Sequence, residues 1–112
     1  MTGTPRRVHG PAQVSNSAAT KYTVPTGVKA WTRGIHIQNP SGAAVTFTMS
    51  IGADAAATRI FDAYSIPAGT TYDYYQRHTL EATQIVQALA GTNNILVLTI
   101  DVDEAIVGTP SA

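Results

Sequence analysis

The chain has 112 residues, and its seven basic and seven acidic side chains cancel to a formal net charge of zero. This length predicts one domain, and the balanced charge disfavours nucleic acid and anionic membranes as partners. The absence of cysteine excludes disulfides, thiolate zinc sites and thiol nucleophiles. No apolar run approaches the roughly 20 residues of a membrane span, and the start lacks a signal peptide's apolar region. We therefore expect a soluble protein that is not exported by the usual route.

Charged residues are scarce, at 12% of the chain, which is about half of the usual share. A solvated surface rich in threonine would explain this, because threonine suits β-strands. Burial of the surface against other subunits would explain it equally well, because charge is depleted at interfaces. Composition leaves both explanations open.

Residues 1–20 show no period of apolar side chains. They combine two prolines and the pair Arg6 and Arg7 with small polar residues, which is typical of an extended arm outside the core. Such an arm is ordered only where something holds it, so we predict that it lies along a neighbouring subunit. Arg6 and Arg7 are candidate subunit contacts, and two arginines in a neutral chain are weak grounds for a nucleic-acid contact.

From residue 21 onward the chain alternates between short strands and turns. A short strand ends at Pro25 and Gly27, and a longer one follows over 30–39. A two-residue period places four side chains of the longer strand on one face: Trp31, Arg33, Ile35 and Ile37.

The segment 45–51 has the clearest strand pattern. Its apolar side chains alternate with hydroxyl side chains, as in a half-buried strand: Val45, Phe47, Met49 and Ile51 against Thr46, Thr48 and Ser50. The preceding residues Asn39–Gly42 read "NPSG", a typical turn sequence. We therefore predict that residues 35–52 form a β-hairpin.

The remaining segments repeat this pattern at spacings near ten residues. Expected strands cover 58–66, 70–78, 84–90 and 95–103, with turns at 67–69 and 91–94. In the first of these, alternation places Ile60, Asp62 and Tyr64 opposite Phe61, Ala63 and Ser65. The last begins with apolar residues on both faces, as expected of a central strand.

Taken together, these segments predict an all-β fold. The expected architecture is an antiparallel β-sandwich or jelly roll of about seven to eight short strands with an extended N-terminal arm. The predicted boundaries are the arm over 1–20, the sandwich domain over 21–104 and a C-terminal tail over 105–112.

No set of side chains is spaced for catalysis or for binding a cofactor. His9, His36 and His78 lack the spacing of zinc ligands. Ser41 and Ser65 lie at turns, without the sequence pattern around a hydrolase nucleophile. We therefore predict no catalytic, cofactor-binding or metal-binding residue.

Two groups of charged residues need an explanation. In "DVDE", Asp101 and Asp103 share a strand face and Glu104 points away, which disfavours a calcium site. Asp54 and Arg59 stand at the two ends of a loop. We favour a surface ion pair between them, with a subunit contact as the alternative.

The aromatic residues of "TYDYYQR" allow two interpretations. With Trp31 they would form the sugar-stacking platform of a glycan-binding module, but Tyr72 and Tyr74 share one strand face and Tyr75 lies on the other. A place in the core or at a subunit interface is favoured, because aromatic residues are enriched at interfaces. Trp31, Tyr72 and Tyr74 are therefore candidate subunit contacts, with a glycan as the alternative ligand.

The order of these segments resembles that of a known family. "YTVPTGVKA", "NPSGAAVTFTMSIGADAAATRIFD", "IPAGTTYDYY" and "LEA" before an apolar strand are similar to the small β-sandwich virion proteins of tailed bacteriophages. The likeness covers residues 20–102. Family members tend to have a glycine soon after "LEA", where this chain has Thr83, so the conformation of that turn is in question.

The resemblance implies a non-enzymatic structural protein of the virion, assembled in the host cytoplasm. Its partners would be copies of itself, as a trimer or hexamer, and other virion proteins. A minor tail or tail-tip component is the first expectation, and a capsid decoration protein is the second. A glycan-binding module on the particle surface is the alternative from another class.

Overall fold

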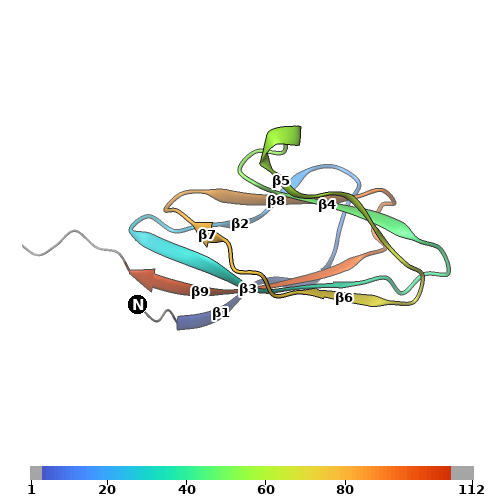
Figure 1. Cartoon of the computed structure of the whole chain (residues 1–112), viewed down its shortest axis with the longest axis horizontal. Coiled ribbons are helices and arrows are strands. Elements are labelled where there is room, and N and C mark those ends of the chain that lie inside the picture. Colours follow the sequence, from blue (N-terminus) through green and yellow to red (C-terminus); the bar gives the residue numbers. More distant parts are fainter. Residues whose placement is uncertain (1–3, 107–112) are drawn as a thin grey trace, which may run out of the picture.

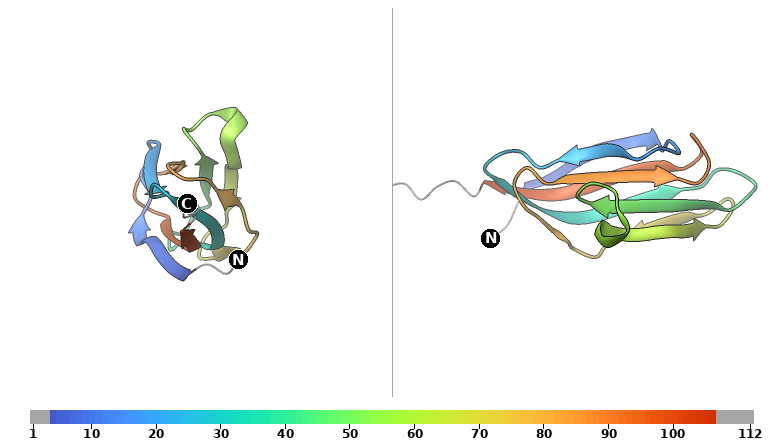
Figure 2. Two further views of the ribbon diagram at one scale, coloured as in Figure 1. Left: turned by 90° about the vertical axis from the view of Figure 1, so that its left-hand side faces the viewer. Right: turned by 90° about the horizontal axis from the view of Figure 1, so that it is seen from above.

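The computed structural model describes residues 4–106. Its strands form two antiparallel sheets that pack face to face, so the predicted all-β sandwich is confirmed (Figure 1). Sheet A has the order β1-β9-β3-β6, with β7 also paired to β3, and sheet B has the order β2-β8-β4-β5. Figure 2 shows the two layers from the end and from above.

The strands differ in length, and those of sheet A include the longest. Sheet A contains β1 (Thr4–Gln13), β3 (Val28–Gln38), β6 (Thr71–Tyr74), β7 (Thr79–Leu80) and β9 (Val97–Ile106). Sheet B contains β2 (Ala19–Thr23), β4 (Val45–Ile51), β5 (Arg59–Ile66) and β8 (Ile85–Ala90). A short 3₁₀ helix, η1 (Ala56–Thr58), precedes β5.

One apolar core lies between the sheets. Alternate residues of each strand point into it, which is the physical meaning of the two-residue period in the sequence. Its largest fully buried side chains are Phe47, Ile35, Ile37, Met49, Ile66, Leu80, Leu96, Leu98, Ile100, Val14, Val24 and Val102.

The predicted hairpin over residues 35–52 is wrong, because β3 and β4 lie in different sheets. The turn between them is a crossover from one layer to the other. Asn39 is completely buried and donates hydrogen bonds from Nδ2 to the carbonyls of Ala43 and Ile66, each at 2.9 Å. The Oδ1 atom of Asn39 accepts two hydrogen bonds from Ser41, one from the backbone N–H at 3.0 Å and one from the side-chain hydroxyl at 2.7 Å. The hydrogen bond to Ile66 thus connects the crossover to the last residue of β5.

Residues 4–13 differ from the predicted arm, because they form β1 and pair with β9 of the same chain. Two register shifts interrupt the pairing of β1 with β9. Each shift breaks the two-residue alternation of side chains, so the sequence of β1 shows no regular strand pattern. Val14, directly after β1, is completely buried. No neighbouring subunit is needed to order this part of the chain.

The predicted C-terminal tail also begins later than expected. Ala105 and Ile106 belong to β9. Residues 107–112 of the predicted tail, and residues 1–3 of the predicted arm, lie outside the described residues.

A β-bulge in β3 corrects the predicted face of that strand. Thr32 pairs with Val102, and Gly34 pairs with Asp101, so Arg33 is an extra residue. An extra residue inverts the faces that follow it. Trp31 and Arg33 therefore point away from the core, while Ile35 and Ile37 are buried in it.

Three turns share one hydrogen-bond pattern, and two of them have glycine at the third position. The carbonyls of Pro25, Pro67 and Glu81 each accept from the N–H three residues later. Gly27 and Gly69 have φ of 77° and 68°, and Thr83 stands at the equivalent position with φ of 67°. The structure thus places a β-branched residue in a left-handed conformation that favours glycine.

Candidate functional site: two interaction surfaces

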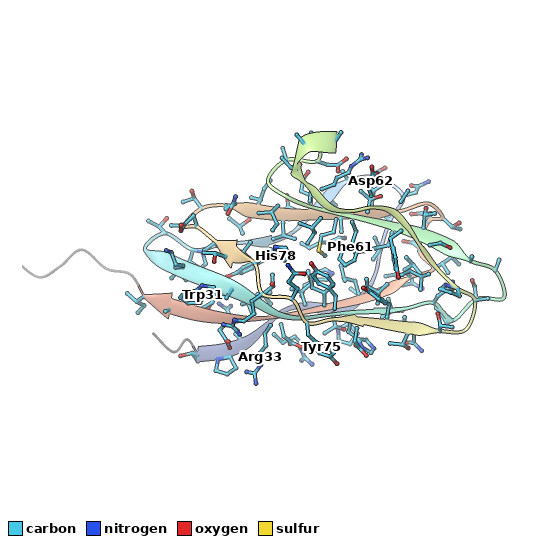
Figure 3. The ribbon with its side chains drawn as sticks, in the orientation of Figure 1. Trp31, Arg33, Phe61, Asp62, Tyr75 and His78 are labelled. Carbon is cyan, nitrogen blue, oxygen red and sulfur yellow. The ribbon has the colours of Figure 1, made fainter. Side chains whose placement is uncertain are left out.

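Four aromatic side chains fill one side of the sandwich between β5 of sheet B and β6 of sheet A. The ring centroids of Phe61 and Tyr74 are 4.7 Å apart, those of Phe61 and Tyr72 are 6.1 Å apart, and those of Tyr64 and Tyr72 are 5.0 Å apart. Phe61 is buried and lies between the layers (Figure 3). Tyr72 and Tyr74 are half-buried, and Tyr64 is 43% exposed. We call these four residues the tyrosine edge.

A second β-bulge builds the tyrosine edge. Tyr64 pairs with Phe47 and Phe61 pairs with Met49, so Asp62 and Ala63 together oppose one residue of β4. The bulge puts Phe61 and Tyr64 on the same face, whereas strict alternation predicts opposite faces.

Thr48 stabilises this bulge. Its Oγ1 accepts a hydrogen bond from the N–H of Ala63 at 3.0 Å, and Ala63 has φ of 49°. Thr48 belongs to the hydroxyl face predicted for β4, but it is buried. Its hydroxyl therefore accepts from a backbone N–H that the interruption of strand pairing at the bulge leaves without a ladder partner.

The tyrosine edge contains no Asp, Glu, Lys, Arg or His side chain, and its polar atoms are the tyrosine hydroxyls. Burial raises the pKa of Tyr72, and the hydroxyls of Tyr64 and Tyr74 nearby raise it further. The hydroxyl of Tyr74 lies 2.7 Å from Nε2 of His78, and the two rings are stacked. The edge therefore presents aromatic surface and hydroxyl groups.

The structure separates the aromatic residues proposed as a sugar platform. Tyr72 and Tyr74 pack into the tyrosine edge, whereas Tyr75 is 70% exposed. Trp31 lies on the outer face of sheet A, next to Arg33 on the same strand. In Figure 3, Tyr75 and Arg33 both point away from the core on that outer face.

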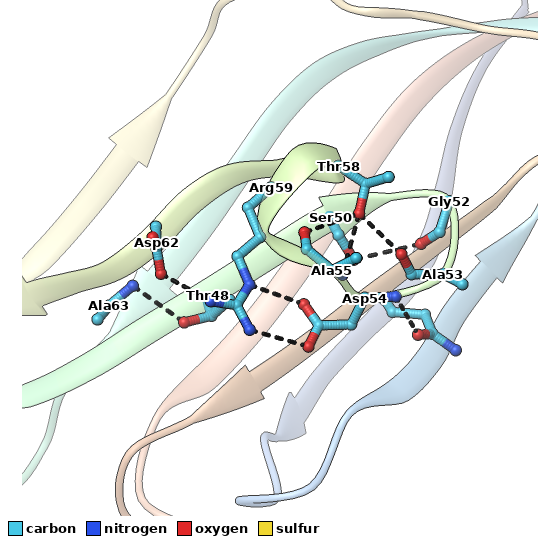
Figure 4. A network of polar contacts seen from close by, with 11 residues as sticks. Thr48, Ser50, Gly52, Ala53, Asp54, Ala55, Thr58, Arg59, Asp62 and Ala63 are labelled. Atoms are coloured by element: carbon cyan, nitrogen blue, oxygen red, sulfur yellow. Dashed lines mark hydrogen bonds and ion pairs between the residues drawn. The ribbon is translucent and has the colours of Figure 1, made fainter.

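The ion pair predicted between Asp54 and Arg59 is present (Figure 4). Nε and Nη2 of Arg59 donate to the two carboxylate oxygens of Asp54 at 3.0 and 3.1 Å, and Nη1 donates to Asp62 at 2.9 Å. The hydrogen bonds from Arg59 hold the pKa of the Asp54 carboxyl below its usual value. The backbone N–H of Asp54 also donates to Gln87 of β8, so the pair secures the loop over sheet B.

The second surface is an open hollow of about 390 Å³ on the outer face of sheet A. Three arginines, one tyrosine and one carboxylate line it together with two small or apolar residues: Pro5, Arg6, Arg7, Arg33, Gly34, Tyr75 and Asp101. We call it the arginine hollow. Sequence reasoning missed this surface, because it depends on the pairing of β1 with β9 and on the bulge at Arg33.

The two arginines predicted as subunit contacts in the arm have different surroundings. Arg6 donates to Glu104 at 3.0 Å. Glu104 also accepts a hydrogen bond from the Tyr22 hydroxyl of sheet B; burial first, and then this contact, raise the pKa of Tyr22. Arg7 forms no ion pair with any residue in the range 4–106.

The histidines and acidic residues do not converge. His36 pairs with Asp73 on the outer face of sheet A. Burial lowers the pKa of His9, and the charge of Lys21 lowers it further. Within residues 4–106 no three histidine or acidic side chains lie close enough to hold a metal ion. Over the same range no helix is long and apolar enough to span a membrane.

No protein-family model matches the sequence, and no curated protein matches it significantly.

Proposed function

We propose that this chain is a non-enzymatic building block of a tailed bacteriophage particle, in first place a tail or tail-tip component. In this proposal it assembles with copies of itself and with other virion proteins through the tyrosine edge. The observation that carries the proposal is the character of that edge, which is aromatic and partly exposed at Tyr64. Protein interfaces are enriched in tyrosine and depleted in charge at their centre.

Charge supports self-association as the first step. The chain has a formal net charge of zero, so identical subunits meet without net repulsion. The acidic neighbours of the edge already have partners within the chain, since Asp62 pairs with Arg59 and Asp73 contacts His36. A trimer or hexamer is the assembly that the family resemblance implies.

The candidate contacts from the sequence contribute unequally to this proposal. Tyr72 and Tyr74 belong to the tyrosine edge and support it. Asp54, Arg59 and Arg6 already have partners within the chain, so a subunit contact through them would have to replace existing ion pairs. The proposal therefore uses the tyrosine edge as the interface.

The mass of the protein in solution tests the assembly step. We expect native mass spectrometry to give a trimer or hexamer for the unmodified chain and a shift to monomer for Tyr64→Glu, which places a charge in the edge. Tyr75→Glu is the matched control, because Tyr75 is exposed on the outer face of sheet A and should leave the mass unchanged. A wild-type monomer at high micromolar concentration, or identical masses for both variants, would contradict the proposed interface.

The number of copies in purified particles tests the location. Quantitative mass spectrometry of virions should find a small number of copies if the chain belongs to the tail tip. Hundreds of copies per particle would refute the tail location and make the chain a capsid decoration protein. Absence of the chain from purified particles would refute a virion role altogether.

A further inference from the structure

The arginine hollow carries a set of groups that assembly through the tyrosine edge does not use. Its cationic side chains come from two strands that β9 separates, Arg6 and Arg7 on β1 and Arg33 on β3. Arg6 has a close partner in Glu104, whereas Arg33 lies 3.5 Å from Asp103, at the outer limit of a hydrogen bond. Asp103 has a second, closer cationic partner in Arg77, at 2.9 Å, so Arg33 can leave its longer ion pair with Asp103 without leaving that carboxylate unpaired. Arg7 forms no ion pair within residues 4–106, so an anion from outside would meet Arg7 directly and Arg33 by exchange with Asp103.

Asp101 supplies a carboxylate in the same hollow. Asp101 lies on β9, in register with Arg7 of β1 on one side and with Gly34 of β3 on the other. Residues in register point to the same face of a sheet, so the Asp101 side chain lies on the outer face with that of Arg7. Asp101 forms no ion pair within the range that the structure describes. The hollow thus offers guanidinium donors and a carboxylate acceptor without an ion pair among the described residues.

Tyr75 forms an aromatic wall of the hollow. A Cβ atom at Gly34 would lie 3.7 and 3.8 Å from Cε1 and Cδ1 of Tyr75, so the ring rests over the glycine backbone. The residue nevertheless remains 70% exposed. Because its ring is supported on one side and open on the other, Tyr75 presents a flat apolar surface beside Arg33.

We infer that the arginine hollow binds an acidic sugar residue of a glycan. Arg7 and Arg33 would donate to its carboxylate, since guanidinium groups suit planar anions. Asp101 would accept hydrogen bonds from the sugar hydroxyls, and the sugar ring would pack on Tyr75. This site differs in place and in residues from the platform that the sequence suggested around Tyr72 and Tyr74.

Size and charge favour this ligand over a nucleic acid. The hollow of about 390 Å³ falls within the range of roughly 300–1,000 Å³ typical of small-molecule sites. A phosphodiester backbone would bring a row of charges past Asp101, which lines the hollow, and past Asp103, which pairs with Arg33. A single carboxylate surrounded by hydroxyl groups matches the mixed donors and acceptor better.

The test is an NMR titration of the ¹⁵N-labelled full chain with trigalacturonic acid and with its methyl ester. The ester keeps the rings and hydroxyl groups but removes the negative charges. We expect the acid to shift the amide signals of Gly34, Tyr75 and Asp101, and the ester to bind about tenfold more weakly or worse, since the charged hydrogen bonds are lost. Equal affinity for acid and ester, or no shift at these amides, would overturn the inference.

Variants assign the binding to named side chains. Arg33→Gln and Tyr75→Ala should each weaken binding of trigalacturonic acid by about tenfold. Lys29→Gln removes one positive charge at the pair with Glu81, outside the hollow, and should leave affinity unchanged. Circular dichroism checks that each variant is folded.

Two further probes separate this site from other anion sites. Inorganic phosphate that binds as tightly as the sugar, together with no effect of Tyr75→Ala on the sugar, would show a general anion site and overturn the inference. A short single-stranded oligonucleotide that binds the same amides more tightly than the sugar would overturn it in favour of nucleic acid. The titration does not depend on the assembly state, so its failure leaves the proposed function to its own tests.

Discussion

Asn39 offers the sharpest test of how the two layers are connected. Its amide is completely buried and makes four hydrogen bonds, of which the bond to the carbonyl of Ile66 joins the crossover to β5. We predict that Asn39→Ala lowers the free energy of unfolding by about 2–4 kcal/mol. This sum counts only the buried bond to Ile66: about 1 kcal/mol for the lost neutral hydrogen bond and about 1–3 kcal/mol for the buried carbonyl left without its donor. The other three bonds are partly buried, so water can replace the amide there.

Urea unfolding at neutral pH measures this loss. Trp31 is the chain's one tryptophan, so its fluorescence and the far-ultraviolet circular dichroism report on the same transition. Ser41→Ala is the control, because its hydroxyl bonds to Asn39 and Ala43 lie at the partly exposed side of the turn. This control should lose about 1 kcal/mol or less.

The variant Asn39→Asp adds a pH signature to the same test. A buried carboxylate would face the carbonyls of Ala43 and Ile66 and could not donate to them, so the folded pKa of the new group should rise above its unfolded value of about 3.9. Relative to Asn39→Ala, this variant should be more stable below pH 4 and lose that advantage as the pH rises through the folded pKa. A loss below about 1 kcal/mol for Asn39→Ala, equal to that of Ser41→Ala, would refute this account of the crossover.

Two further predictions concern the turns and the loop. Thr83→Gly should raise the free energy of unfolding by about 0.5–1 kcal/mol, because glycine relieves the left-handed strain at φ of 67°. The control Ala82→Gly, in the same turn, should not stabilise the protein. A lower free energy of unfolding for Thr83→Gly would contradict the proposed strain. Asp54→Asn should lower the thermal midpoint at pH 7. The folded pKa of Asp54 lies below its unfolded value of 3.8, so its contribution is present above pH 3.8 and is lost as the pH falls through the folded pKa. The difference in midpoint between the wild type and Asp54→Asn should therefore shrink below pH 3.8, and a difference independent of pH would argue against the ion pair.

Much of the local structure could be predicted from the sequence, because its causes are local. The alternation over 45–51 correctly places Val45, Phe47 and Met49 in the core, and the turn residues mark where strands end. The prediction that the opposite face is solvated is wrong for Thr48 and Ser50, which are also buried. Asp54 and Arg59 are five positions apart, so a loop between them brings the side chains together. The family resemblance put the turn at Thr83 in question, and the structure gives this threonine a left-handed φ of 67°.

The candidate surfaces needed the tertiary structure, because single extra residues decide them. A bulge at Arg33 turns Trp31 and Arg33 outward, and a bulge at Asp62 and Ala63 brings Phe61 and Tyr64 to one face. Gly34 is a local indication of the first bulge, since an isolated glycine inside a strand often accompanies one, but it does not say which side chains turn outward. The bulge at Asp62 and Ala63 has no comparable glycine. The tyrosine edge and the arginine hollow both depend on these shifts.

The sequence by itself thus determined that the chain is a β-sandwich, since a two-residue period and frequent turns suit few other folds. Only the tertiary structure decided which strands pair. A strand with one apolar face can pair with the next strand of the chain in a hairpin, or it can lie in the other sheet and face that strand across the core. Its apolar face is buried in either arrangement. Long-range contacts such as those of Asn39 with Ile66, and of β1 with β9, select between these arrangements.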